Sequence, residues 1–462
     1  MTRTRRTHRA TAATGPTALR PRPSVQVVAV AALVAVLALL AGCSNPSSSS
    51  SSTTTSTVDV GGSTTTTEPA AESIVFTTVE GNIDAYLPTD PFTRQRVVAA
   101  GTGPAGTSPH GQICFDSNGS RRFVVAETRT PHAGTPPVAS AGWGLYQLSG
   151  SGIGEFEVHR ITGWDSPSVP SADAPTTYGC TFLSTGQLLT TDVGNRQTGD
   201  ATGQLIEYFP PFDAGVPASC TVAKAIASPL GLSSGPDDVV YLASSRAPTA
   251  GIWRYSGSFP TSAAACTTAT VDPPATPGTT LPPPTTTTTI AGRGTTTTTT
   301  RPTTSTTPPK PAEPLVSTLF IPASPTGLST PAGVSVAPSG NAVVVTSPID
   351  GKILAFGIDG SPLQTVLEPT TGTTLGPATS FPGGTPFGVA VTPEGGIVYV
   401  DPGLVRDAKG TVGPGPQTGS LRIIETQNGS TAPPQDIDTG LDDPDGLGLF
   451  VPSGGGSAAS KV

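Results

Sequence analysis

This sequence is poor in charged and aromatic side chains. Only 12% of its 462 residues are Asp, Glu, Lys or Arg, 5% are aromatic, and methionine occurs once. The net charge is −8, although the first 42 residues carry six arginines and no acidic residue, so the rest of the chain is more acidic still. An acidic chain without a basic patch argues against nucleic acid as a partner.

The sequence also lacks the patterns of a structural metal site, of a membrane-spanning helix and of long amphipathic helices. No Cys-x-x-Cys or His-x-x-x-His pair indicates a structural metal site. No apolar run reaches the roughly 20 residues needed to cross a bilayer as a helix, and no helical periodicity of any length follows residue 72. In contrast, 55 glycines and 51 prolines are present, which fits short strands and many turns joined to unfolded Ser/Thr/Pro tracts.

The N-terminus has the order of an export signal. Arginines precede a 16-residue apolar run, Val25 to Leu40, and small residues follow it. Leu40-Ala41-Gly42-Cys43 resembles the bacterial lipobox, which implies cleavage before Cys43 and a lipid on that cysteine. We therefore expect a signal peptide over 1–42, and a lipoprotein on the extracytoplasmic face of the cell membrane. Twin-arginine export at Arg5-Arg6 is a weaker alternative, because the apolar run is distant.

Residues 43–72 are mostly Ser and Thr and have little to bury, so they predict a flexible linker. A second Thr/Pro-rich tract, 273–314, predicts a disordered insert beside an outer strand, because such runs cannot supply a core. Residues 453–462 are expected to form a flexible tail.

A sheet-building unit recurs about six times between these tracts. It is complete in Thr330 to Phe356, where a Pro-x-Gly opener and an alternating strand precede a turn, a β-branched strand and a third strand. Its period of about 50 to 70 residues, once the insert is subtracted, is that of a four-stranded blade. The openers are Pro109-His110-Gly111, Thr177-Tyr178-Gly179, Pro229-Leu230-Gly231, Pro331-Ala332-Gly333, Pro386-Phe387-Gly388 and Pro444-Asp445-Gly446.

The two ends of the repeat region complement each other. Ser73 to Tyr86 has a second and a third strand but no opener, whereas Pro444 to Phe450 is an opener strand with nothing after it. Joining them would remove the exposed sheet edges at the seam. The sequence therefore predicts an all-β, six-bladed β-propeller over 73–272 and 315–452, closed by one blade built from both ends.

The repeat resembles those of the NHL-repeat, gluconolactonase-like and TolB-like six-bladed propellers. The nearest local likeness is Gly186 to Asn195, where Leu-Leu-Thr-Thr-Asp-Val-Gly-Asn is similar to the strand and turn of an NHL repeat. This resemblance implies that the residue before each repeat glycine, and the end of each second strand, come out near the axis on one face.

Four cysteines remain besides Cys43. In an oxidising compartment an even number indicates disulfides, here two. Cys114 and Cys180 fall on first strands of successive repeats, so we expect pairing in sequence order, with Cys220 bonded to Cys266. Four cysteines allow three connectivities.

The face at which the residues before the repeat glycines and the ends of the second strands come out near the axis is the predicted binding face. Most polar candidates for a binding site lie on it, and the loops after the second strands are long and rich in Gly and Pro. Asp192 and Asp401 also suit turn caps. The candidate residues of this face are His110, Glu127, Tyr178, Asp192, Asp401 and Asp445.

Two functions from different classes fit this face. We favour a scaffold that binds a protein, glycan or small ligand without metal, cofactor or covalent chemistry. The alternative is a metal-dependent lactonase of the gluconolactonase-like type, whose resemblance implies calcium or another divalent ion on oxygen ligands. Against it, that family places asparagine before the repeat glycines, where this chain has Leu230, Ala332 and Phe387. A quinone-dependent dehydrogenase would use His110 as its base and has less support.

Overall fold

The structure is a computed structural model, and it describes eleven ranges of the chain. The predicted signal peptide, linker and tail, and nearly all of the predicted insert, lie outside them. All described residues belong to one compact unit, Glu68–Val462. No helix within these ranges is long and apolar enough to cross a membrane. The ranges are 73–89, 91–101, 107–129, 141–167, 177–194, 201–271, 313–369, 379–380, 384–407, 412–427 and 430–452.

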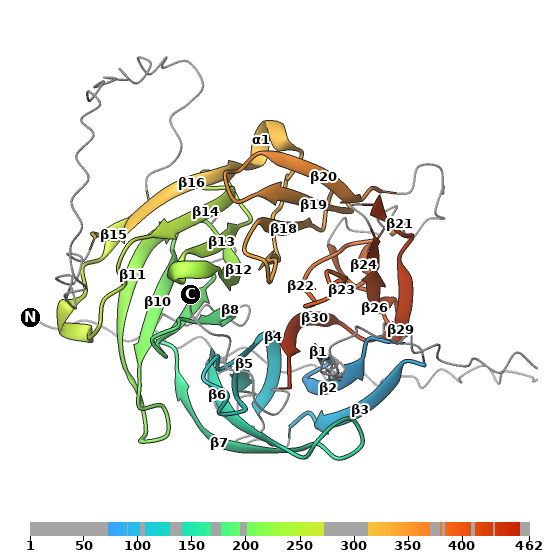
Figure 1. Ribbon diagram of the computed structural model, residues 1–462, viewed down its shortest axis with the longest axis horizontal. Coiled ribbons are helices and arrows are strands. Elements are labelled where there is room, and N and C mark those ends of the chain that lie inside the picture. Colours follow the sequence, from blue (N-terminus) through green and yellow to red (C-terminus); the bar gives the residue numbers. More distant parts are fainter. Residues whose placement is uncertain are drawn as a thin grey trace, which may run out of the picture. The chain divides into compact units, whose positions relative to one another are not determined.

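Six antiparallel sheets stand around a central axis as the blades of a propeller (Figure 1). From the axis outward, blade 1 is β30 (Pro444–Phe450), β1 (Ile74–Val79), β2 (Asn82–Leu87) and β3 (Thr93–Val98), and blade 2 is β4 (Thr107–Phe115), β5 (Arg122–Arg129), β6 (Ala141–Ser149) and β7 (Glu157–Asp165). Blade 3 is β8 (Thr177–Phe182), β9 (Leu188–Asp192), β10 (Gly203–Phe209) and β11 (Ala218–Ile226), with β15 (Ala269–Thr270) added parallel to β11. Blade 4 is β12 (Pro229–Ser234), β13 (Val240–Ser244), β14 (Gly251–Ser256) and β16 (Val316–Pro322). Blade 5 is β17 (Val334–Val336), β18 (Ala342–Ser347), β19 (Lys352–Gly357) and β20 (Pro362–Leu367), and blade 6 is β22 (Val389–Val391), β23 (Ile397–Asp401), β26 (Gly419–Ile424) and β29 (Gln435–Leu441).

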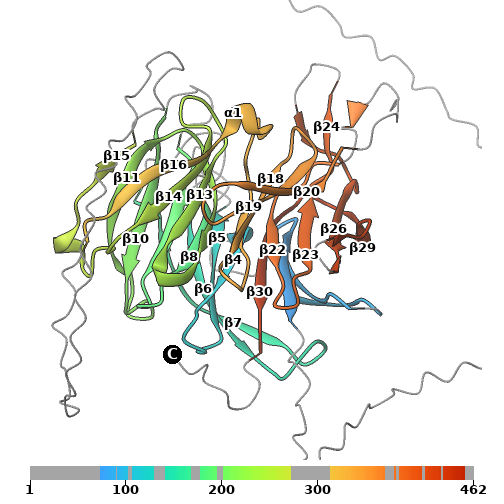
Figure 2. The same cartoon turned by 45° about the horizontal axis from the view of Figure 1, so that its top comes forward.

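Short elements decorate this ring. A three-stranded sheet extends blade 6 beyond the end of β23. Its strands are β21 (Thr379–Ser380), β24 (Leu404–Arg406) and β25 (Val412–Pro414), of which β24 is labelled in Figure 2. The hairpin of β27 (Thr426–Gln427) and β28 (Ser430–Thr431) connects β26 to β29. The helical turns are α1 (Ala323–Thr326) and the 3-10 turns Pro236–Asp238 and Ala263–Ala265.

The predicted closure of the ring is confirmed. Strand β1 pairs antiparallel with β30, with Ile74 opposite Phe450, so the first blade combines strands from both ends of the repeat region. The predicted second strands are confirmed as well, for example Leu188–Asp192 as β9 and Ile397–Asp401 as β23.

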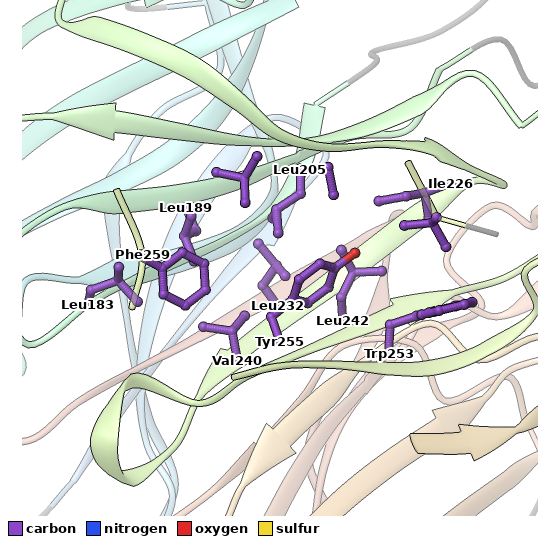
Figure 3. Packing of buried hydrophobic residues seen from close by; sticks show 13 residues of the cluster. Leu183, Leu189, Leu205, Ile226, Leu232, Val240, Leu242, Trp253, Tyr255 and Phe259 are labelled. Atoms are coloured by element: carbon purple, nitrogen blue, oxygen red, sulfur yellow. The ribbon is translucent and has the colours of Figure 1, made fainter. Parts of the chain in front are cut away.

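Each blade packs on its neighbours through both faces, which explains the nearly continuous apolar second strands. In β9, Leu188 packs in the cluster between blades 2 and 3, whereas Leu189 packs in the cluster between blades 3 and 4. Figure 3 shows the second of these clusters, in which Leu205 of blade 3 faces Leu232 and Leu242 of blade 4. Successive side chains along such a strand therefore point alternately into two buried interfaces, and not alternately into a core and into solvent.

Threonine hydroxyls link alternate pairs of blades close to the axis. Thr191 Oγ1 accepts a hydrogen bond from the Gly179 amide of its own blade (2.7 Å) and donates to the Leu230 carbonyl of the next blade (2.8 Å). Thr346 in blade 5 makes the corresponding bonds to the Gly333 amide and to the Phe387 carbonyl of blade 6. In blade 1, Thr78 Oγ1 accepts from the Gly446 amide, and its hydroxyl, which donates to Asp445 Oδ1, lies 3.2 Å from the Gly111 carbonyl of blade 2. The same position in blades 2, 4 and 6 holds Ala126, Ala243 and Val400.

Both predicted disulfides form, Cys114 with Cys180 and Cys220 with Cys266. The first joins β4 to β8 across the interface between blades 2 and 3. The second forms because β15 returns to the outer edge of blade 3, so that Cys266, just before it, lies beside Cys220 on β11. The fourth strand of blade 4, β16, comes only after the predicted insert.

Candidate functional site

The residues before the repeat glycines gather at one end of the ring axis, here called the axial mouth (His110, Tyr178, Leu230, Ala332, Phe387 and Asp445). Tyr178 of blade 3 and Phe387 of blade 6 meet across the axis, with ring centroids 5.4 Å apart and an interplanar angle of 84°. The Tyr178 hydroxyl donates to the Asp445 carbonyl oxygen of blade 1 at 2.5 Å. With Leu230 and Ala332, these rings fill the axis.

A glutamine closes the axis beneath this plug. Gln112 of blade 2 reaches blade 4, where its Nε2 donates to the Leu232 carbonyl (2.7 Å) and its Oε1 accepts from the Leu232 amide (3.1 Å). The space left between Gln112 and Tyr178 is about 10 Å³, roughly the room of one water molecule. The axis therefore does not offer a channel to a ligand.

Above the plug, over blades 4 to 6, lies a pocket of about 210 Å³, here called the mouth pocket. Its floor and apolar walls are Leu230, Ala332, Pro348, Ile349, Phe387 and Leu404. Its polar lining is Ser228, Ser245, Arg246 and Thr330. Leu404 belongs to β24, so the small sheet that extends blade 6 supplies one wall.

The mouth pocket has an apolar floor and a polar rim. The apolar floor can take the hydrophobic part of a small molecule, and hydroxyls with one guanidinium can orient its polar head. Arg246 is the charged residue of the lining, and guanidinium groups pair well with carboxylates. Arg246 is not among the residues predicted from the sequence, although it lies in the turn after β13, the type of loop in which binding residues were expected.

Three of the predicted site residues do come together at the mouth. The His110 ring Nε2 lies 2.9 Å from the Thr177 carbonyl oxygen, beside Tyr178. Asp445 Oδ1 accepts from the Gly111 amide at 3.0 Å and from the Thr78 hydroxyl. These groups form a polar side of the mouth over blades 1 to 3, opposite the mouth pocket.

Glu127 is not part of this group. Its side chain is 2% exposed, and the Arg160 guanidinium donates to both carboxylate oxygens at 2.8 Å. The Tyr146 hydroxyl donates to Oε1 at 2.6 Å, and burial together with the charge of Glu127 raises the pKa of Tyr146. Glu127 therefore belongs to a buried ion pair within blade 2. Arg160 lies 33 residues away on the outer strand, and no local pattern links the two residues.

Asp192 and Asp401 cap turns. Asp192 Oδ1 accepts from the Gly194 amide at 3.0 Å, and burial raises the pKa of Asp192 to about 7. Asp401 Oδ1 accepts from the Gly403 amide (2.8 Å) and from the amide and hydroxyl of Thr385 (3.0 and 2.6 Å). The turn-cap interpretation of both residues is confirmed.

Among the described residues, these contacts leave no set of oxygen ligands that fits a divalent ion on the axis. Within the described ranges, no group of three or more His, Cys, Asp or Glu side chains is placed to hold a metal. Leu230, Ala332 and Phe387 occupy the positions where the lactonase resemblance implies ligands. The described residues at the mouth thus do not fit the metal of the alternative hypothesis.

One nucleophile-like motif has a structural role instead. Gly231-Leu232-Ser233-Ser234-Gly235 has the Gly-x-Ser-x-Gly spacing, but it runs along strand β12 rather than through a strand-turn-helix elbow. The Ser233 hydroxyl accepts from the Val336 amide of blade 5 at 3.0 Å. Ser233 therefore connects two blades.

No protein-family model and no curated protein matches this chain. Solved propellers do resemble it. A chain of a nidogen–laminin complex is 10% identical (TM-score 0.45), and the periplasmic gluconolactonase of Pseudomonas aeruginosa is 12% identical (TM-score 0.44), each over 82% of this chain and 99% of its own. The calcium-binding protein regucalcin of Agrobacterium tumefaciens is 11% identical over 72% of this chain and 82% of its own, with a TM-score of 0.35. We draw no conclusion about activity from similarity at this level.

Proposed function

We propose that this protein is an exported, lipid-anchored propeller that binds a small amphipathic ligand in the mouth pocket without covalent chemistry of its own. The observation that carries this proposal is the Tyr178–Phe387 plug, which turns the end of the axis into an apolar floor. A ligand with one apolar ring or short chain and an acidic head matches a floor of this kind with Arg246 at its rim.

The pocket is also built to keep its shape. Leu230 and Ala332 are 5% and 1% exposed, and their backbones are tied to neighbouring blades by the Thr191 hydroxyl and by the bond from the Gly231 amide to the Ala332 carbonyl. A preformed floor lowers the entropy cost of binding, which favours recognition of a small molecule over a large flexible one. Protein and glycan partners are therefore the less favoured occupants.

The binding proposal is tested by fragment binding to the purified full chain. Benzoate and hexanoate, with the neutral amides of the same shape, serve as probes in ligand-observed NMR and calorimetry. Ala332→Phe should fill the floor and weaken binding of both acids at least tenfold. Arg246→Gln should remove the preference for acids over amides. Val216→Phe, at a side chain 79% exposed in the β10–β11 turn, is the matched control and should bind like the wild type. Unchanged binding by Ala332→Phe, or no binding by the wild type, would refute the proposal.

The membrane anchor is a separate part of the proposal. It rests on the Leu40-Ala41-Gly42-Cys43 motif after the apolar run. Cells fed labelled palmitate should incorporate label into the wild-type chain, found in the membrane fraction, and Cys43→Ser should abolish both. Label that survives Cys43→Ser would exclude attachment at Cys43, whatever the outcome of the fragment experiments.

A further inference from the structure

The interface between blades 2 and 3 contains buried polar atoms that have no hydrogen-bond partner in the part of the chain that the structure describes. Asp192 Oδ2, Trp164 Nε1 and Tyr208 Oη are all inaccessible to solvent and make no hydrogen bond to another of the described residues. Each of the three residues is 1% exposed. Buried polar atoms of this kind nearly always have a partner, since an unpaired one costs about 1 to 3 kcal/mol.

The three side chains face the same interface. Leu188 and Asp192 lie on one side of β9 because side chains alternate along a strand, and Leu188 packs in one cluster with Trp164 and Tyr208. The Trp164 and Tyr208 rings are in edge contact, with centroids 5.6 Å apart.

The pKa of Tyr208 agrees with this arrangement. Burial raises the pKa of Tyr208, and the negative charge of Asp192 raises it further. The donor groups of Ser166 and Trp164 lower the pKa of Tyr208, because they favour its phenolate. An unpaired carboxylate oxygen, an indole N–H and a phenol thus share one buried region.

We propose that this region is a hydration site, in which one or more buried water molecules link Asp192 Oδ2 to Trp164 Nε1 and Tyr208 Oη. Water suits the set because it can accept from the indole and at the same time donate to the carboxylate, and it needs two to four polar partners. A metal cation is disfavoured because an indole N–H and a phenol O–H are donors. The site joins blades 2 and 3 at an interface where Ala126 takes the place of the bridging threonine.

The chain's three tryptophans make this proposal testable by NMR. The full ¹⁵N-labelled chain should show three indole N–H signals, assigned with Trp164→Phe, Trp143→Phe and Trp253→Phe. The Trp164 indole proton should show a cross-relaxation peak to long-lived water. Trp253 is the internal control, because its Nε1 donates to the Thr249 carbonyl at 2.8 Å. Its indole proton should show no such peak.

Two variants separate bound water from proton exchange through the phenol. Tyr208→Phe removes the phenol proton that could relay exchange from solvent, and the Trp164 peak should persist. Asp192→Leu removes the polar anchor and fills the space, so the peak should fall at least fivefold. Asp401→Leu is the matched control at the equivalent position of blade 6 and should leave the peak unchanged.

A Trp164 indole proton without a water peak in the wild type would overturn the proposal, as would a peak lost in Tyr208→Phe or retained in Asp192→Leu. If Asp192→Leu fails to fold, a crystal structure of the wild type at about 1.8 Å decides the question. Density for water within hydrogen-bond distance of Asp192 Oδ2 supports the site, and a direct bond from Oδ2 to a protein group refutes it.

Discussion

Tyr178 and Phe387 stand on opposite blades of the ring and touch edge to face across its axis, at 5.4 Å between centroids. Their contact converts what could be an open channel into the floor of a pocket. The hydroxyl of Tyr178, in blade 3, also donates a hydrogen bond to the carbonyl of Asp445 in blade 1. The plug thus connects blades that share no strand pairing. The plug therefore contributes to stability, and in the proposed function it also forms the floor of the binding pocket.

The hydroxyl of Tyr178 should be measurable as a stabilising bond. Tyr178→Phe removes one buried hydrogen bond, so the free energy of unfolding should fall by about 1 kcal/mol in urea titration. Tyr255→Phe is the matched control, because the buried Tyr255 hydroxyl has no partner among the described residues. That variant should unfold like the wild type or later, and an equal loss in both would contradict the assigned role of the Tyr178 bond.

The threonine links between blades predict that two neighbouring threonines of β9 contribute unequally to the stability of the fold. Thr191→Val leaves the Gly179 amide and the Leu230 carbonyl without their bridge, which should cost about 1 to 3 kcal/mol. Thr190→Val next to it removes only a 3.5 Å contact to the Ile206 carbonyl and should cost much less. Chemical unfolding of the two variants side by side makes the comparison, and equal losses would rule out a special role for Thr191.

Two buried acids predict that stability declines as pH rises. Burial raises the pKa of Glu207 from 4.5 to about 8 and that of Asp192 from 3.8 to about 7. The folded state then holds more protons than the unfolded state between about pH 4 and 8. Stability from these groups is fully present below that window and is lost as pH rises through it, by up to about 1.4 kcal/mol per pH unit for each group.

Glu207→Gln should flatten this dependence in unfolding midpoints measured from about pH 4 to 8.5. Glu157→Gln, at a side chain 75% exposed, should leave it as in the wild type. Identical pH profiles for wild type and Glu207→Gln would show that Glu207 is not the titrating group.

The two disulfides should differ in their response to reductant. Cys180 is fully buried and Cys114 is 7% exposed, whereas Cys220 and Cys266 are both half-buried. Under native conditions, dithiothreitol should therefore open the Cys220–Cys266 bond first, as read by alkylation and mass spectrometry. The double variant Cys114→Ala, Cys180→Ala should lose about 2 to 5 kcal/mol of stability. Preferential reduction of the Cys114–Cys180 bond would contradict the order expected from burial.

The buried ion pair of blade 2 separates a structural role of Glu127 from a metal-binding role. Arg160→Met leaves a buried carboxylate without its cation, so stability should drop by about 3 to 5 kcal/mol. Glu127→Gln should leave the metal content of the purified chain unchanged in elemental analysis. A stoichiometric ion that disappears in Glu127→Gln would revive the lactonase alternative.

Much of the architecture could be predicted from the chain alone. The alternation of strands such as Leu188–Asp192, the recurring glycine openers and the two complementary ends are local patterns that follow from the period of two along a strand and from turn chemistry. The same patterns predicted both disulfides and the turn caps at Asp192 and Asp401. Composition and the lipobox-like motif yield an expectation about export, which stays a prediction.

The site itself depends on contacts that form only in the folded chain. The pairing of Glu127 with Arg160, the reach of Gln112 into blade 4 and the meeting of Tyr178 with Phe387 join residues 33 to 209 positions apart in the sequence. Whether a side chain points toward the axis, a neighbouring blade or solvent depends on the twist and tilt of each blade against the next. Local patterns were therefore enough to predict six blades that close into a ring, whereas packing between distant blades gives the axis an apolar plug and a pocket instead of converging carboxylates.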